Sequence, residues 1–434
     1  MQRNKAIYTI AEGQCTILKR RMLNWSRPFS ILVFLDSNGY TDQYSRYECL
    51  VAAGAHTSIP LADGLSGLSD HHAEHKDWLF GHINYDYKNS MEPALSSKHE
   101  TVTGFEELSF FCPETVCYIN KEQNELVIET FAGDAEAIYE AIMQAPDELQ
   151  TDVPEVAFNK RTTQDKYLEV VNRLREHIKD GDCYEINYCN ENYAERVSLE
   201  PLNAFAKLNK ISNAPFAAYY RNNESYMMCA SPERYVRKDG DTVISQPIKG
   251  TARRGSDKEK DELIKRQLSE SVKDRAENVM ITDLVRNDLA RSCTTGSIEV
   301  KELFGIYSFP QVHQMISTVS GKLEDGGAVT DAIKYSFPMG SMTGAPKIKV
   351  MQLIEDYEDC RRELYSGTIG YITPAGDFDF NVVIRSLFYN AKSGYLCYQA
   401  GGAITYDSSA EAEWDEMRLK GWAMERIFSP EGKL

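Results

Sequence analysis

Hydrophobic side chains recur at helical spacing in some parts of the chain and at strand spacing in others. Over residues 164–179 they repeat every three or four positions, which predicts an amphipathic helix that Gly181 would end. From 183 to 197, Tyr184, Ile186 and Tyr188 alternate with other residues, as in a half-buried strand. The same periodicity predicts helices over 134–144, 201–210, 256–291, 347–357 and 410–428. The rest of residues 1–145 is expected to form strands and turns.

Strands account for most of the remaining pattern. They are expected over 81–87, 216–220, 226–229, 234–238, 242–248, 297–309, 312–323, 366–373, 378–388 and 395–399. Asp239-Gly240 is a favoured two-residue turn, so the strands on either side of it should form a hairpin. The second strand of this hairpin leads to Lys249.

Lys249 follows an extended, apolar segment. Ile244, Pro247 and Ile248 precede it, and Gly250 allows a ligand to approach the backbone closely. A lysine at the end of a buried strand loses hydration, which would lower its pKa and leave a neutral, nucleophilic amine. The alternative is an ordinary exposed lysine after a strand.

Composition limits the class of protein. The chain has 434 residues, 42% of them hydrophobic, which is enough for a substantial core. Acidic residues outnumber basic ones 65 to 48, so a nucleic-acid-binding surface is not expected. The amino-terminal segment has no apolar signal region, and the run 31–35 is too short to span a bilayer, so we expect no membrane association and a cytoplasmic location. The ten cysteines lack a Cys-x-x-Cys pair and are expected to be reduced, buried thiols.

An acidic, proline-bounded stretch at 146–154 predicts a linker between an amino-terminal region, 1–150, and a second region, 155–430. The first region contains no catalytic motif. Its histidine cluster, His71, His72 and His75, is expected to lie in a polar, solvated loop, because its spacing matches no zinc signature.

Two of the predicted helices each carry a pair of acids three residues apart. Asp274 and Glu277 lie on a face that continues as apolar, and Glu413 and Glu416 are followed on the same line by Lys420. A solvated face would explain the second pair alone. Together, the two pairs are what a Mg²⁺ site made of carboxylates and waters requires.

Several other residues are candidates for chemistry. Glu233 lies near the end of a strand adjacent in sequence to the Lys249 strand, where it could donate a proton or be an ordinary turn residue. Arg385 interrupts an apolar run, so it must pair with an acid or hold a ligand carboxylate. The glycine-rich loop 337–347 precedes a helix and could bind an anion, but it lacks the order of a phosphate-binding loop.

These features occur together in an order that resembles the chorismate-utilising enzymes. The motifs are Pro247-Ile248-Lys249-Gly250-Thr251, 274–289, 340–347, Ile384-Arg385-Ser386, Ala400-Gly401-Gly402 and 413–420. The resemblance covers residues 160–427 strongly and the first 145 weakly. It implies an α+β fold like that of anthranilate synthase component I, with two large antiparallel β-sheets packed as a sandwich, helices outside, and both regions intertwined.

The resemblance also implies a reaction. Family members that form anthranilate, isochorismate or salicylate carry alanine where this chain has Lys249. For the lysine-bearing branch, the resemblance implies that the amine adds to C2 of chorismate, after which ammonia enters at C4 and gives 4-amino-4-deoxychorismate, a precursor of para-aminobenzoate and folate. Glu233 matches the proton donor to the leaving hydroxyl, and His313, which alone would be structural, matches an active-site histidine.

Further roles follow from the same resemblance. It implies that Glu277 and Glu416 bind Mg²⁺ and that Asp274 and Glu413 hold its waters. The implied substrate-binding residues are Arg385, Tyr371, Lys420, Gly401, Gly402, Thr251 and Thr343. Because no Gly-x-Cys-x-Gly nucleophile segment is evident, ammonia is expected from a glutamine amidotransferase partner.

Two alternatives remain open from the sequence. One is an anthranilate synthase component I, which would attach nitrogen at C2. The other is a non-catalytic protein that binds chorismate or tryptophan.

Overall fold

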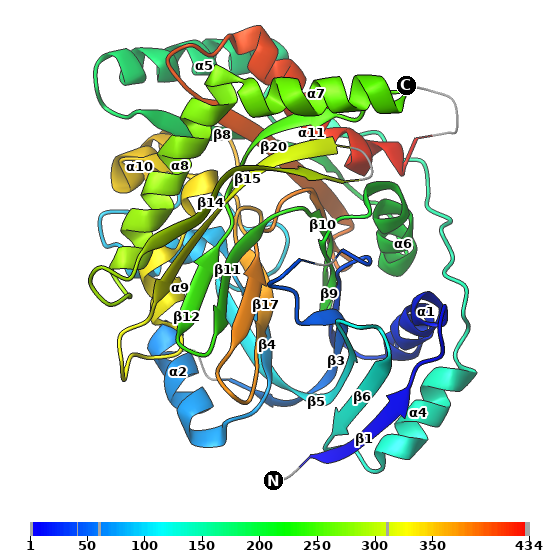
Figure 1. Cartoon of the computed structure of the whole chain (residues 1–434). Helices are drawn as coiled ribbons and strands as arrows, with labels where there is room; N and C mark the ends of the chain where they lie inside the picture. The colour runs from blue at the N-terminus through cyan, green and yellow to red at the C-terminus, as the bar shows by residue number, and fades with distance from the viewer. Residues whose placement is uncertain (1–2, 41, 60–61, 310–311, 430–434) are drawn as a thin grey trace.

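The computed structural model describes residues 3–40, 42–59, 62–309 and 312–429. Within these residues, hydrogen-bonded pairings connect twenty strands, and every pairing between them is antiparallel. Helices cover the outside of this sheet (Figure 1). The α+β class expected from the sequence is therefore confirmed.

The helices are mostly short and lie at the surface. They are α1 (Cys15–Ser26), α2 (Gly64–His75), α3 (Lys88–Met91), α4 (Ala135–Gln144), α5 (Gln164–Lys179), α6 (Pro201–Ser212), α7 (Lys258–Glu270), α8 (Val272–Ala290), α9 (Asp331–Ser336), α10 (Lys347–Tyr357) and α11 (Ala410–Arg426), with 3₁₀ turns η1 (Tyr85–Tyr87) and η2 (Gly340–Met342). The helix predicted over 164–179 has the predicted bounds, because its buried face repeats at helical spacing.

The sheet has two arms that start from one long strand, β5 (Leu108–Asn120). The first arm runs β3 (Tyr47–Ser58), β2 (Ile31–Asp36), β9 (Phe216–Asn222), β10 (Ser225–Ser231), β19 (Ser386–Asn390), β20 (Tyr395–Ile404) and β8 (Glu185–Ala194). The short strands β7 (Asn159–Lys160) and β16 (Gly344–Ala345) pair with β8. Strand β6 (Glu125–Thr130) forms a hairpin with β5, and β1 (Asn4–Thr9) pairs with the other edge of β6.

The second arm begins on another part of β5. It runs β4 (Leu79–Ile83), β17 (Thr368–Ile372), β18 (Phe378–Asn381), β11 (Arg234–Asp239), β12 (Thr242–Ser245) and β15 (Val312–Lys322), and ends with β13 (Ile248–Arg253) and β14 (Glu299–Ser308). The hairpin at Asp239-Gly240 is confirmed, since Asp239 pairs with Thr242.

The two arms pack face to face, which gives the expected sandwich. Alternate residues of each strand point to opposite sides, so Val33 joins an inner core with Phe380 of the other arm, whereas Phe34 points to the outer face. Both layers belong to one continuous sheet, because β5 hydrogen-bonds to strands of each arm.

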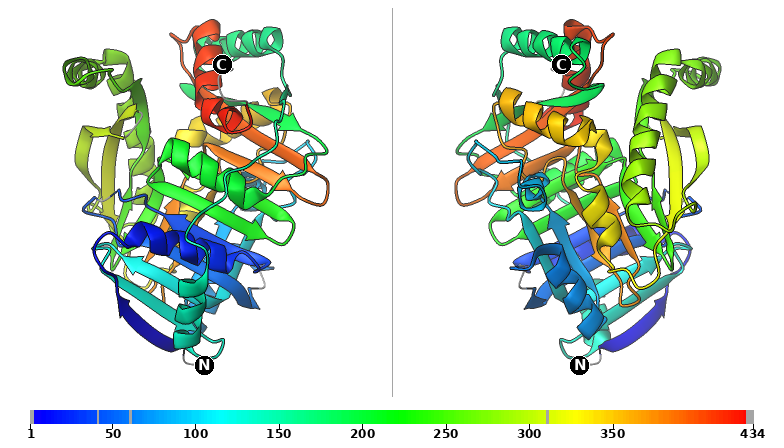
Figure 2. Two further views of the ribbon diagram at one scale, coloured as in Figure 1. Left: turned by 90° about the vertical axis from the view of Figure 1, so that its right-hand side faces the viewer. Right: turned by 90° about the vertical axis from the view of Figure 1, so that its left-hand side faces the viewer.

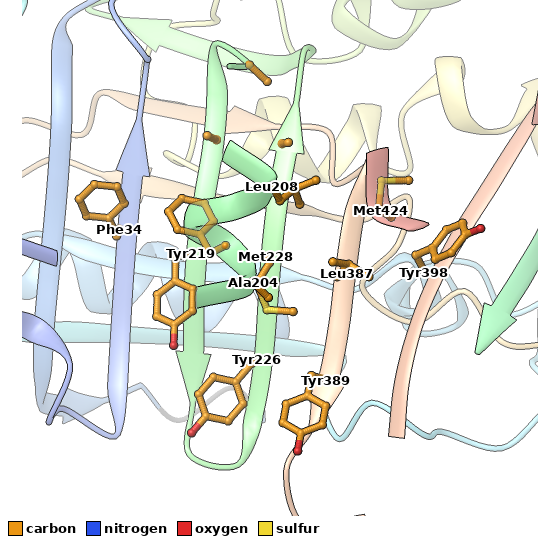
Figure 3. Packing of buried hydrophobic residues seen from close by; sticks show 14 of the residues in the cluster. Phe34, Ala204, Leu208, Tyr219, Tyr226, Met228, Leu387, Tyr389, Tyr398 and Met424 are labelled. Carbon is orange, nitrogen blue, oxygen red and sulfur yellow. The ribbon is translucent and has the colours of Figure 1, made fainter. Parts of the chain in front are cut away.

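The outer face of the first arm is covered by helices. Figure 3 shows Ala204 and Leu208 of α6 against Tyr219 and Met228 of the sheet. Leu208 and Met228 are fully buried, and each such side chain contributes about 1.5–3 kcal/mol of burial free energy. The same core includes Ile186 of β8 and Ile404 of β20, two strands that carry candidate site residues.

The histidine cluster does not lie in a loop. It belongs to α2, whose buried face is made by Leu65, Leu68 and His72 at helical spacing, and His72 Nε2 lies 2.8 Å from the Thr373 carbonyl oxygen. The sequence interpretation was wrong because these apolar positions were assigned to a polar segment. His71 and His75 stack on each other with ring centroids 4.1 Å apart.

Two predicted elements are broken in the structure. The helix over 256–291 divides at Ser271, whose extended backbone and hydroxyl cap α8 by accepting a hydrogen bond from the Asp274 amide. The strand over 378–388 is interrupted between Asn381 and Ser386, and within this interruption Arg385 adopts a left-handed φ of 54°. Each break lies beside a candidate site residue.

Two sequence-based expectations concern the cysteines and membranes. Each cysteine is a free thiol, and all but Cys360 are buried, as expected. Throughout the described ranges, each helix is too short or too polar to cross a bilayer.

Candidate active site

The free ends of the two arms meet through a buried ion pair. Lys249 lies on β13 at the end of one arm, and Glu185 lies on β8 at the end of the other. Their Nζ and Oε1 atoms are 2.5 Å apart, and the residues are only 9% and 3% exposed. The lysine is thus held by a carboxylate that comes from a distant part of the chain.

This pairing reverses the expected ionisation of Lys249. Burial opposes the charged amine, but the carboxylates of Glu185, Glu277 and Glu233 outweigh it and raise the pKa of Lys249. The prediction of a neutral amine was therefore wrong for the ligand-free protein, because the acids that surround the lysine cannot be seen in its local sequence.

Glu233 lies between β10 and β11 and faces the same site. It is 5% exposed, and burial raises its pKa to about 7, although Ser341, Lys249 and the Ile248 amide favour the charged form. A substantial fraction of Glu233 is therefore protonated near neutral pH. Such a carboxyl group can donate a proton.

The two acid pairs approach the site from α8 and α11. Figure 2 shows these helices, in green and red, on opposite sides of the same end of the molecule. A Cβ atom on Gly250 would lie 3.0 Å from Asp274 Oδ1, and one on Gly402 would lie 3.1 Å from Glu413 Oε2. Glycine at both strand positions therefore leaves room for the acids.

All four acids act on one cation. Lys273 is largely exposed, and although partial desolvation lowers its pKa, Asp274, Glu277, Glu413 and Glu416 together raise it. Burial raises the pKa of both Glu277 and Glu413, whereas Lys420, 2.8 Å from Glu416, lowers the pKa of that acid. Carboxylates that share a cation in this way match the oxygen ligands preferred by Mg²⁺. In the described part of the chain, no group of three potential ligands is close enough to form a metal site as it stands.

Arg385 is a half-buried cation beside this cluster. Burial lowers its pKa, and Tyr365 and Glu416 only partly offset that effect. Among the described residues, no hydrogen bond or ion pair joins its guanidinium to a partner; its backbone carbonyl accepts from the Ala230 amide. An unpaired, desolvated guanidinium is suited to an incoming carboxylate.

Tyr371 does not lie with Arg385. Its ring packs against Tyr47, Trp78 and Phe80, with centroids 5.7, 6.1 and 6.0 Å away. The alternation of β17 directs this side chain into another cavity, which Tyr47 and Asp379 also line. Tyr365 is the tyrosine whose charge affects Arg385, so it is the better candidate for this part of the site.

The remaining candidates are distributed around the Lys249 strand. Lys420 Nζ donates to the Gly401 carbonyl oxygen at 2.9 Å, which ties α11 to β20. Thr343 is fully buried at the end of η2, and its carbonyl oxygen accepts from the Asn187 amide. Thr251 lies on β13 and is exposed.

His313 is already paired. Its Nδ1 lies 2.8 Å from Ser308 Oγ, and its Nε2 lies 3.0 Å from Asp261 Oδ1. These contacts join β15 to β14 and α7. A direct role for His313 in chemistry stays a prediction.

The sequence interpretation missed Glu185 and Tyr365. The sequence interpretation named the alternating residues Tyr184, Ile186 and Tyr188 of this strand but not Glu185, which lies between the first two. In the structure Glu185 is buried and Tyr184 is 72% exposed. At this end of β8 the charged side chain is therefore buried and the neighbouring aromatic side chain is exposed.

Known proteins resemble the chain in sequence and in fold. A sequence profile of chorismate binding enzymes matches residues 37–426. Aminodeoxychorismate synthase component 1 of Salmonella typhimurium is 37% identical over 274 residues, which cover 63% of this chain and 59% of that protein. An anthranilate synthase component I-like protein of Synechocystis is 33% identical over 362 residues, 82% of this chain and 73% of that protein.

The solved structures share the fold at lower identity. Anthranilate synthase component I from Streptococcus pneumoniae has a TM-score of 0.77 and 24% identity, over 89% of this chain and 94% of that one. The menaquinone-specific isochorismate synthase from Escherichia coli has a TM-score of 0.75 and 16% identity, over 99% of this chain and 95% of that one. The aligned part of this chain spans 59% and 55% of the lengths of two curated aminodeoxychorismate synthase components, from Salmonella typhimurium and Escherichia coli. Since the family profile matches most of the sequence, the chain belongs to the chorismate binding enzymes.

Proposed function

We propose that this chain converts chorismate and ammonia to 4-amino-4-deoxychorismate, as component I of an aminodeoxychorismate synthase. The observation that carries the proposal is the buried Lys249, which lies against Glu185 and within the field of Glu233. The relatives named aminodeoxychorismate synthase component 1 support it. An enzyme that lets ammonia attack C2 directly has no use for a buried lysine at this point.

Substrate binding would begin with the two carboxylates of chorismate. The Arg385 guanidinium has no hydrogen-bond or ion-pair partner among the described residues, so it can hold the enolpyruvyl carboxylate, with Tyr365 beside it. Lys420 of α11 lies against the backbone of Gly401 and Gly402 in β20. These groups would fix the ring so that C2 faces Lys249.

The second carboxylate would be held through Mg²⁺. Glu277 and Glu416 would bind the ion, and Asp274 and Glu413 would hold its waters. These acids come from α8 and α11, and all four interact electrostatically with the same lysine, Lys273. When bound, the ion would neutralise the ring carboxylate and stabilise the charge that develops on the ring.

The chemistry would proceed in two displacements. The neutral Lys249 amine forms a bond to C2, the ring double bonds shift, and the C4–O bond breaks as Glu233 gives its proton to the leaving hydroxyl, which departs as water. Ammonia then forms a bond to C4, and the C2–N bond breaks so that its electron pair returns to Lys249. Glu233 recovers a proton from the new ammonium group.

Ammonia would come from a glutamine amidotransferase partner. The chain shows no segment typical of a glutamine-hydrolysing nucleophile. The word component in the names of its relatives agrees with a second subunit. Ammonium salts should therefore support turnover by the isolated chain, and glutamine should not.

Product analysis tests this proposal. The purified chain, given chorismate, Mg²⁺ and ammonium, should yield 4-amino-4-deoxychorismate, which chromatography with mass detection separates from anthranilate and isochorismate. Anthranilate as the main product would favour the anthranilate synthase alternative. Tight binding of chorismate without turnover would favour a binding protein.

A further inference from the structure

The proposed reaction leaves one proton without an assigned acceptor. In the ligand-free protein Lys249 is an ammonium ion, which cannot attack chorismate until it loses a proton. Lys249 is only 9% exposed, so bulk water has limited access to the amine. The acceptor must therefore lie within the site.

Four acids act on Lys249 from the elements around it. Glu233 approaches from the β10–β11 connection, Glu277 from α8, Glu416 from α11 and Glu185 from β8. Glu233 must itself be protonated to act on the leaving hydroxyl, and Glu277 and Glu416 are assigned to the metal. Of these four described acids, Glu185 alone has a direct contact with the amine, at 2.5 Å.

The position of Glu185 is fixed by the sheet and by burial. Its backbone is fixed opposite Ala345 in the β8–β16 pairing, and the side chain is 96% removed from solvent. Within the described ranges, Lys249 is the one side chain to which its carboxylate is hydrogen-bonded. The other acid on the same buried strand, Glu191, pairs with Arg161 and Tyr395.

We propose that Glu185 aims the Lys249 amine into the site and accepts its proton when chorismate binds. This inference rests on the proposed function, because it assigns a step of that reaction. It makes Glu185 a positioning residue that acts through Lys249.

The step is balanced within the pair. A proton moves from Nζ to Glu185 Oε1, and the freed electron pair on Nζ forms the bond to C2 while Glu233 protonates the departing hydroxyl. When ammonia displaces the lysine, the C2–N electron pair returns to Nζ, which takes the proton back from Glu185. The transfer converts two buried charges into two neutral groups, a change that a site closed to water favours.

A purely electrostatic role for Glu185 and a role as proton acceptor predict opposite changes in the rate of adduct formation when Glu185 is replaced by glutamine. If Glu185 only stabilised the ammonium ion, Glu185→Gln would lower the pKa of Lys249, leave more neutral amine and accelerate attack. If Glu185 accepts the proton, the same variant should form the Lys249 adduct about 100-fold more slowly near neutral pH, in line with the usual effect of removing a general base. Its rate should then rise with pH, because the proton must leave to solvent.

The experiment measures adduct formation in a single turnover. The full chain is mixed with chorismate and Mg²⁺ in the absence of ammonia, and samples are quenched at intervals. Intact mass spectrometry then gives the fraction of protein that carries the adduct, and the measurement is repeated over a range of pH. Glu185→Asp should recover part of the rate, since it restores a carboxylate on a shorter arm. Glu191→Gln is the matched control, because it removes a buried, ion-paired acid from the same strand and should leave the rate near that of the parent.

A second readout needs no chorismate. Labelling of Lys249 by an amine-reactive reagent, followed by peptide mapping, reports its ionisation, and Glu185→Gln should shift the labelling profile to lower pH. An unchanged or faster adduct rate in Glu185→Gln, or an unmoved labelling profile, overturns the inference. If the parent protein forms no adduct, both the proposed function and the proton transfer are contradicted. If the adduct forms at the same rate with and without the Glu185 carboxylate, only the proton transfer to Glu185 is contradicted.

Discussion

Replacing Glu233 with glutamine should stabilise the protein and disable it at the same time. Glu233 is buried, and its pKa lies at about 7 instead of the usual 4.5. The folded state therefore keeps a proton that the unfolded state releases between these two values. The free energy of unfolding of the parent protein should fall as pH rises through this window and then stay level.

The size of the effect follows from the shift. At about 1.4 kcal/mol for each pKa unit, the movement from 4.5 to about 7 corresponds to roughly 3 kcal/mol of lost stability above pH 7. Glu233→Gln stays neutral at every pH and escapes this loss. The variant should match the parent near pH 4.5 and exceed its unfolding free energy by about 3 kcal/mol at alkaline pH.

Urea denaturation at about pH 5 and about pH 8.5 measures this difference. Glu191→Gln serves as a control, since it breaks a buried ion pair with Arg161 and should lower stability at both pH values. In the same samples, Glu233→Gln should reduce kcat by about 100-fold or more, because the leaving hydroxyl loses its proton donor. A stability difference that does not change with pH, or full activity, would refute the assignment of Glu233 as a buried acid.

Three further outcomes follow from the site. Arg385→Leu should lower kcat/KM for chorismate by about 100-fold through loss of a desolvated carboxylate contact, and unchanged kinetics would mean that the guanidinium has another role. Glu277→Gln should abolish turnover while circular dichroism shows an unchanged fold, because Mg²⁺ requires charged oxygen ligands, and full parent activity in excess chelator would contradict this. Gly402→Ala should raise the Mg²⁺ concentration needed for half-maximal activity, because its Cβ would lie 3.1 Å from Glu413 Oε2; the parent Mg²⁺ requirement would count against the placement of that acid.

Local features of this fold could be predicted from the sequence. The helix α5 and the Asp239-Gly240 hairpin are determined by neighbouring residues, so spacing and turn chemistry were sufficient. The break at Ser271 also has a local cause, since serine is a strong helix cap. It was not predicted because the helical spacing of apolar residues continues on both sides of Ser271.

The electrostatics of the site could not be predicted in this way. The acid that reverses the expected pKa shift of Lys249 lies 64 residues earlier in the chain, on the other arm of the sheet. Likewise, choosing between Tyr365 and Tyr371 requires knowing which side of β17 faces Arg385. Motifs identified the residue types, whereas only the packing of the two arms decides their charge states and partners.

The central claim is that Lys249 acts as a nucleophile, and its most direct test is the mass of the chain after incubation with chorismate and Mg²⁺ in the absence of ammonia. The account predicts a mass increase equal to chorismate minus water, located by peptide mapping on Lys249, lost in Lys249→Ala and reversed when ammonium is added. No mass increase in the parent protein, together with formation of 4-amino-4-deoxychorismate by Lys249→Ala at the parent rate, would contradict it.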